Sequence, residues 1–170
     1  NANLKTNINE SIGDSMKRRH FLALGFCVIP YMTQVLAADY RKSKPGAWNS
    51  SSINDAAMAL YGREKFATIQ KSANIELVVP KGIVRDPENI PITIHSNIKA
   101  KTVSIFQDAN PQSLVAVFHV REDSIIMYEL NIKMEFKGTV FAVLEGLNGK
   151  LYYAREYIDV LALSCMASGE

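Results

Sequence analysis

The residue with the clearest chemical potential is Cys165, which is followed by only five residues in the 170-residue sequence. The other cysteine, Cys27, lies in a segment that we expect to be removed on export. Cys165 would then have no internal disulfide partner, so it either pairs between molecules or stays a free thiol. Residues near a chain end are often accessible to other proteins. The position of Cys165 therefore indicates a covalent carrier rather than an enzyme.

The sequence around Cys165 supplies nothing that would activate its thiol. Thiolates are favoured by basic neighbours, whereas Ser164 and Met166 are neutral and Glu170 is acidic. Such a thiol is suited to a passive carrier whose chemistry is performed by partner proteins, and poorly suited to a catalytic cysteine.

Two histidines outside the export segment, His95 and His119, allow a different chemistry. A blue-copper site uses two histidines, a cysteine and a weak axial ligand, for which Met134 or Met166 is available. Copper sandwiches usually group cysteine, histidine and methionine on one loop near the chain end, and no histidine follows Cys165. We therefore expect the histidines on polar faces or edges of strands, and predict no metal and no cofactor.

Residues 1–37 consist of an upstream stretch, 1–15, that resembles no targeting element, followed by the pattern of an export signal. A basic group at residues 17–19 is followed by an apolar run from Phe21 to Met32 and by small residues, with a plausible cleavage site after Ala37 or Ala38. The pair Arg18-Arg19 resembles the twin-arginine motif that exports folded proteins. The apolar run is shorter than the ~20 residues that span a bilayer. We predict cleavage and a periplasmic location; the alternative is an uncleaved anchor or an amphipathic terminal helix.

The remaining residues are expected to form one domain. Removing residues 1–37 leaves equal numbers of basic and acidic side chains. This balance gives no electrostatic reason to expect a nucleic acid or a membrane surface as partner. Without a disulfide, hydrophobic burial must stabilise the fold.

Residues 38–74 are expected to lead into the main domain. The polar stretch from Ala38 to Ser52 contains Pro45-Gly46, which predicts an extended segment. Trp48 within this stretch is placed to anchor it to the domain.

A helix is predicted from Ser52 to Tyr61. Ser52 and Asp55 have the spacing of a capping box, and Gly62 suits the end of a helix. One face is apolar, and two later residues extend it: Ile53, Ala56, Ala57, Leu60, Phe66 and Ile69.

From Ile75 onward, apolar and polar residues alternate, which predicts strands. The predicted strands are Ile75–Val79, Ile90–His95, Lys101–Gln107, Leu114–Val120, Ile125–Met134, Thr139–Glu145 and Lys150–Leu163. Asn148-Gly149 is a hairpin signal, and Glu122-Asp123 predicts a turn. Short strands at regular spacing favour a mainly β, immunoglobulin-like antiparallel sandwich over residues 75–163, with a closed barrel as the alternative.

The order of several segments resembles the SoxY family, the sulfur-carrier subunits of the periplasmic Sox thiosulfate-oxidation system. The resemblance covers the twin-arginine leader, Leu60-Tyr61-Gly62, the segments 75–80, 89–94, 103–106 and 114–118, Asn110-Pro111, the segment 149–154 and the near-terminal cysteine. It extends over essentially the whole chain after residue 37.

The resemblance implies that Cys165 holds thiosulfate-derived sulfur covalently while separate enzymes act on it. It also implies a heterodimer with a SoxZ-like sandwich subunit, which would cover an exposed strand edge. The transient partners would be a haem-bearing SoxAX-like protein, a SoxB-like hydrolase and, in some systems, a SoxCD-like dehydrogenase.

The predicted arm, residues 164–170, differs from the family pattern. The family usually flanks its cysteine with glycines, whereas only Gly169 is near Cys165 here. If the last strand ends at Leu163, Cys165 lies about 7 Å beyond it. Two other functions stay open at this point. One is a noncatalytic assembly domain, and the other is a redox or metal enzyme that needs both histidines close to Cys165.

Overall fold

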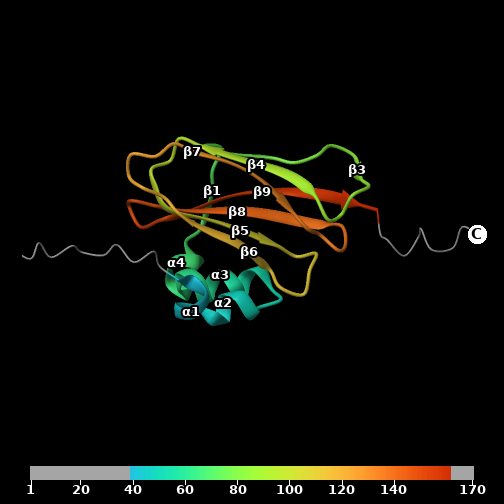
Figure 1. The fold of residues 1–170 in the computed structure, drawn as a ribbon. Helices are drawn as coiled ribbons and strands as arrows, with labels where there is room; N and C mark the ends of the chain where they lie inside the picture. The colour runs from blue at the N-terminus through green and yellow to red at the C-terminus, as the bar shows by residue number, and fades with distance from the viewer. Residues whose placement is uncertain (1–38, 162–170) are drawn as a thin grey trace, which may run out of the picture. The chain divides into compact units, whose positions relative to one another are not determined.

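The computed structural model describes residues 39–161, which form two packed β-sheets and four short helices (Figure 1). The predicted export signal and Cys165 lie outside the described residues. The helices are α1 (Tyr40–Ser43), α2 (Pro45–Asn49), α3 (Ile53–Tyr61) and α4 (Arg63–Ala67). No helix within residues 39–161 is long and apolar enough to cross a membrane.

The strands form a six-stranded and a three-stranded sheet. They are β1 (Gln70–Lys71), β2 (Ile75–Val78), β3 (Ile83–Val84), β4 (Ile90–Ser96), β5 (Ala100–Gln107), β6 (Leu114–His119), β7 (Ile126–Ile132), β8 (Gly138–Gly146) and β9 (Leu151–Val160). The larger sheet has the order β1-β9-β8-β5-β6, with β3 also paired to β9, and the smaller has the order β2-β4-β7. The prediction of a mainly β sandwich is confirmed, and each of the seven predicted strands is present.

Both faces of the larger sheet are covered, one by the smaller sheet and the other by the helices (Figure 1). On the central strand β5, Val103 and Ile105 point into the core between the sheets. Phe106 points the other way, into a second core beneath the helices. Because the side chains of a strand alternate between faces, a sheet covered twice must be apolar on both. The helices therefore form a third layer, where the sequence predicted one short helix.

The segment from Ala38 to Ser52 was predicted to be extended, and within the described residues this prediction is wrong. Asp39 caps α1, since its side chain accepts hydrogen bonds from the backbone N–H groups of Arg41 and Lys42. Pro45 begins α2, because a proline at the first position of a helix loses no hydrogen bond and already has a helical φ. The Pro-Gly pair thus starts a helix where it was interpreted as a break.

The predicted helix at Ser52–Tyr61 is confirmed as α3. The Ser52 side chain accepts a hydrogen bond from the Asp55 N–H, and Gly62 ends the helix with φ of 92°. At its last turn, the Tyr61 hydroxyl lies 2.7 Å from Ser104 Oγ and 3.2 Å from Thr102 Oγ1 on β5. Burial raises the pKa of Tyr61 to about 12, and the hydrogen bonds from Ser104 and Thr102 act in the opposite direction. This polar contact fixes the helical layer on the sheet.

Two strands of two residues each, β1 and β3, were not predicted. Both pair with β9 in parallel, β1 beside Tyr152 and Tyr153 and β3 beside Asp159 and Val160. Two residues are too few to show an alternating pattern, so only the tertiary structure reveals them.

Candidate functional site

The end of β9 is the described position nearest in sequence to the predicted site residue, Cys165. β9 pairs along its length with β8, and its last two residues also pair with β3. The Leu161 N–H then donates a hydrogen bond of 2.9 Å to the Val84 carbonyl oxygen. The chain is therefore held by β8 as far as Ile158 and by the β3 segment as far as Leu161, the last described residue, four positions before Cys165.

The last strand is shorter than predicted. It ends at Val160, not at Leu163: the ladder with β8 ends at the pair of Gly138 and Ile158, and only β3 pairs with the last two residues of β9. Cys165 is five positions beyond Val160, a reach of at most about 17 Å in place of the expected 7 Å. Apolar residues continue in the sequence beyond Val160, so the sequence alone predicted a longer strand.

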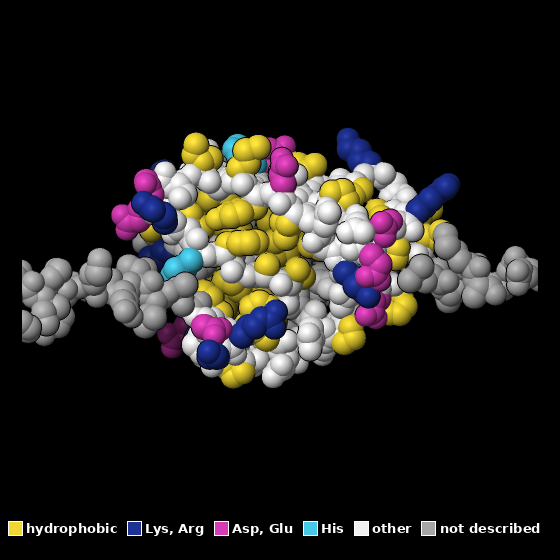
Figure 2. All heavy atoms as spheres, viewed as in Figure 1, with side chains coloured by type: hydrophobic (Ala, Val, Ile, Leu, Met, Phe, Trp, Pro, Cys, Tyr) yellow, Lys and Arg dark blue, Asp and Glu magenta, His cyan; other side chains and the backbone are white. Residues whose placement is uncertain are grey.

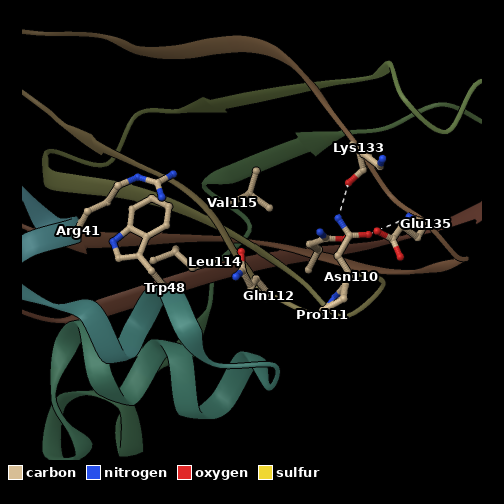
Figure 3. Close-up of a pocket in the computed structure, with 10 residues that line it drawn as sticks. Arg41, Trp48, Asn110, Pro111, Gln112, Leu114, Val115, Lys133 and Glu135 are labelled. Carbon is tan, nitrogen blue, oxygen red and sulfur yellow. Dashed lines mark hydrogen bonds between the residues drawn. The ribbon is translucent and has the colours of Figure 1, made fainter.

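Two loops at this end of the sandwich are joined through Asn110. Its side-chain N–H donates to the Lys133 carbonyl at 2.9 Å, and its Oδ1 accepts from the Glu135 N–H at 2.8 Å (Figure 3). Nearby, the Asp108 side chain accepts a 2.6 Å hydrogen bond from the Thr139 N–H at the start of β8. This role of Asn110, joining two loops, depends on tertiary contacts that no local sequence pattern contains.

A cavity of about 490 Å³ extends from Asn110 to the helical layer. Arg41 and Trp48 line one end, whereas Asn110, Lys133 and Glu135 line the other (Figure 3). The Arg41 guanidinium lies 4.1 Å from the centroid of the Trp48 ring. The Trp48 side chain also packs against the core beneath the helices, which confirms the predicted anchoring role.

The walls of the cavity combine apolar and polar groups. Leu114 and Val115 on β6 supply apolar surface, and Gln107 at the end of β5 supplies an amide. Gln107 is only 2% exposed, and its Oε1 has no hydrogen-bond partner among residues 39–161. A hydrogen bond to Glu88 raises the pKa of Lys133, so its ammonium is already engaged at the rim. Sequence reasoning missed Gln107, since nothing local distinguishes it from a surface glutamine at a strand end.

The two histidines lie on different sheets. His95 is an exposed residue of β4 with its Nδ1 3.8 Å from Glu76 Oε2, and His119 ends β6 beside Tyr40. These are the polar and edge positions predicted for them. Within residues 39–161, no group of three His, Cys, Asp or Glu side chains is placed to hold a metal ion.

Comparison with protein families gives a match to the family described as "Sulfur oxidation protein SoxY" over residues 58–165. The chain belongs to the SoxY family. The match covers more than half of the sequence, and its last residue is Cys165. The resemblance drawn from the order of the sequence segments is thereby confirmed.

Solved structures add a similar chain within the SoxY family. The sulfur carrier protein SoxY from Chlorobium limicola f thiosulfatophilum is 28% identical, with a TM-score of 0.57, over 65% of this chain and 97% of that chain. Superoxide reductases match less well. The Ignicoccus hospitalis protein, at 11% identity and a TM-score of 0.46, covers 52% of this chain and 80% of that chain. A comparison with curated proteins found no match.

Proposed function

We propose that this chain is a sulfur carrier that holds thiosulfate-derived groups covalently on the thiol of Cys165. The observation that supports this most directly is the SoxY family match, which extends from residue 58 to Cys165. A similar structure is that of a protein named as a sulfur carrier. We propose that Cys165 has the same role here.

The described end of β9 suits this role mechanically. A carrier must present its cargo from a fixed point to several partner enzymes in turn. The pairing of β9 with β8 and β3, and the hydrogen bond from Leu161 to Val84, hold the base of the arm. The sandwich thus supplies a firm base, and the residues after Leu161 supply the reach.

The proposed chemistry takes place in two steps on the sulfur of Cys165. Joining the thiol to thiosulfate forms an S–S bond and releases one proton and two electrons, which a haem-bearing SoxAX-like partner would accept. A SoxB-like hydrolase would then add water to the terminal sulfonate, releasing sulfate and one proton and leaving a persulfide on Cys165. A SoxCD-like dehydrogenase would oxidise the remaining sulfur where one is present. All catalysis lies in the partners, in a periplasm reached through the predicted twin-arginine signal.

We further propose that a SoxZ-like subunit binds the side of the sandwich where β6 and β7 end the two sheets. In the described residues β6 pairs only with β5, and β7 only with β4. Phe118 stacks on Tyr128 across this side with ring centroids 4.6 Å apart. Figure 2 shows hydrophobic side chains gathered at the centre of this view, over the region of β6. Unpaired edges with apolar side chains favour a partner protein.

The test is the intact mass of the exported protein, measured before and after a thiol reductant. After incubation with thiosulfate and active partner enzymes, we expect a reducible addition of sulfur or thiosulfate size. Cys165→Ala should lose this addition completely while keeping the same thermal unfolding curve. A single unmodified mass under these conditions would overturn the carrier proposal and favour a noncatalytic assembly domain.

A further inference from the structure

We propose that the cavity between Trp48 and Glu135 receives an extended peptide segment of the partner subunit that binds the side of the sandwich where β6 and β7 end the two sheets. This rests on the proposed function, because that function names a SoxZ-like subunit as the partner at this side. Three features of the cavity support the inference: its place on the open edge, two buried polar atoms without partners, and a guanidinium without an ion pair.

The cavity lies on the open edge of the larger sheet. Leu114 and Val115, which line it, are the first two residues of β6, and β6 pairs within the described residues only with β5. Lys133, on another wall, directly follows β7, which within residues 39–161 pairs only with β4. Two strands, β8 and β5, separate β6 from β9. A partner that binds β6 and β7 would therefore lie against the cavity.

Two residues of the cavity have a buried polar atom without a hydrogen-bond partner. Among residues 39–161, the buried side-chain nitrogens and oxygens that lack one are Trp48 Nε1 and Gln107 Oε1, and both residues line this cavity. Buried polar atoms are nearly always paired, because an unpaired one costs free energy. One of these atoms is a donor and the other an acceptor. A peptide backbone carries both complementary groups, an N–H for Gln107 and a carbonyl oxygen for Trp48.

The polar neighbours of Gln107 are already engaged. The Asn110 side chain is bound at both ends to backbone groups of the loop after β7, and the Lys133 ammonium lies 2.8 Å from Glu88 Oε1. The backbone N–H of Gln107 donates to the Ser113 carbonyl at 2.8 Å, which fixes the residue at the end of β5. A second chain is therefore the source that we infer for the missing hydrogen bond.

The helical end of the cavity offers a positive charge to the segment. Arg41 lies over the Trp48 ring and forms no ion pair within residues 39–161. Leu114 and Val115 supply apolar surface between this end and Asn110 (Figure 3). An acidic side chain near Arg41 and an apolar one beside β6 would complement these walls. The inferred segment is thus extended and bound mainly through its backbone, with one apolar and one acidic side chain.

Gln107 is then suited to the complex and not to the free carrier. In the free carrier its amide oxygen is buried without a partner among the described residues, and in the complex the segment supplies one. Removing the amide should therefore stabilise the free carrier and weaken the complex. A residue that serves only the fold would change the stability and leave the affinity as it was.

The test compares Gln107→Met with Gln70→Met, the same change at an exposed position of β1. Each is made in the full chain, and the probe is the SoxZ-like subunit of the same organism, purified separately. Gln107→Met should unfold at a higher temperature than the parent and bind the subunit about tenfold more weakly, or ~1.4 kcal/mol by calorimetry. Gln70→Met should change neither quantity. An affinity of Gln107→Met equal to that of Gln70→Met would overturn the inference.

A second measurement locates the segment without changing the cavity. Trp48 is the single tryptophan of the sequence, so a carrier labelled with fluorinated tryptophan gives one fluorine NMR signal. This signal should shift when the subunit is added, because the segment enters beside the indole. A signal that stays in place after the heterodimer has formed would overturn the inference.

The charge of the segment is tested with two neighbours on α1. Arg41→Gln should weaken binding severalfold and make the affinity less dependent on salt, because it removes an ion pair at the interface. Lys42→Gln removes the same charge one position further along and should have little effect. Equal effects of the two changes would overturn the assignment of an acidic side chain to the segment.

The docking inference and the carrier proposal can fail separately. A heterodimer that forms, but in which neither Gln107→Met nor the Trp48 signal responds as expected, would remove the docking inference alone. A chain that acquires sulfur on Cys165 but binds no SoxZ-like subunit would remove the docking inference and the partner while keeping the carrier. A docked heterodimer whose Cys165 never acquires sulfur would retain the docking inference and remove the carrier proposal.

Discussion

The two edges of the larger sheet are treated in opposite ways. The edge strand β9 is flanked by β1 near its start and by β3 at its end. The other edge strand, β6, pairs within the described residues only with β5. The chain thus adds two short strands to the edge that leads to the arm and leaves the other edge open. This difference fits the function proposed above, in which one edge would hold the base of the arm and the other would be available to a partner.

The largest expected difference between the edges is in stability. Ile158 on β9 is fully buried, so Ile158→Ala should lower the free energy of unfolding by about 2–5 kcal/mol through the cavity it leaves. Val117 on β6 is half-buried, so Val117→Ala should cost about 1 kcal/mol or less. Urea unfolding followed by fluorescence of the single tryptophan measures both. Equal losses of unfolding free energy in the two variants would contradict this difference between the β9 and β6 edges.

Two equally exposed apolar residues can test whether the partner binds at the open edge or at any exposed apolar side chain. Met127 on β7 is 63% exposed and Ile83 on β3 is 62% exposed. Met127→Lys should weaken the heterodimer with a SoxZ-like subunit about 100-fold, or ~2.7 kcal/mol, because it places a charge in the interface. Ile83→Lys should leave the affinity unchanged. Co-expression followed by size-exclusion chromatography and calorimetry measures this, and equal effects would place the partner elsewhere.

Tyr61 joins the helical layer to the larger sheet, on the face opposite the smaller sheet. Tyr61→Phe should cost about 1–3 kcal/mol at neutral pH, because Ser104 and Thr102 lose their buried partner. Hydrogen exchange of the variant measures where protection is lost. If only the helices lose protection, and β9 and β6 keep theirs, the difference between the two edges does not depend on the helical layer.

The pH dependence of Tyr61 gives the same contact a second test. Its pKa is raised from 10 to about 12 on folding, so its contribution is complete below pH 10 and is lost as the pH rises toward 12. The loss is at most about 2.7 kcal/mol. Stability should therefore fall less steeply above pH 10 in Tyr61→Phe than in Tyr157→Phe, whose side chain is exposed. Parallel curves would show that Tyr61 is not the group that titrates.

The smallest effect is expected at the ion pair between α4 and β8. Lys65 Nζ lies 2.6 Å from Glu145 Oε1, and the Lys65 side chain is 48% exposed. Solvent screens such a pair, so Lys65→Ala should change stability by less than about 1 kcal/mol and by less still in high salt. A larger loss would show that the helical layer depends on charge more than on its buried core.

The sequence alone was sufficient for the elements that repeat a local pattern. Alternation located the seven longer strands, and Ser52, Asp55 and Gly62 located α3 at both ends. The order of these segments, together with Cys165, was enough to indicate the SoxY family. The helices before Ser52 were missed because Pro45-Gly46 can begin a helix or break one, and the choice depends on packing against the sheet.

What only the tertiary structure decided depends on residues far apart in sequence. β9 ends at Val160, where its ladder with β3 also ends, two residues after its ladder with β8, and no local pattern shows where these partners stop. The contrast between the closed and open edges requires the pairing of every strand. The cavity beside Gln107 exists because α1 and α2, the end of β5 with the loop after it, the start of β6 and the loop after β7 come together. Local sequence sets the period of each element, whereas edges, strand ends and cavities depend on what each element packs against.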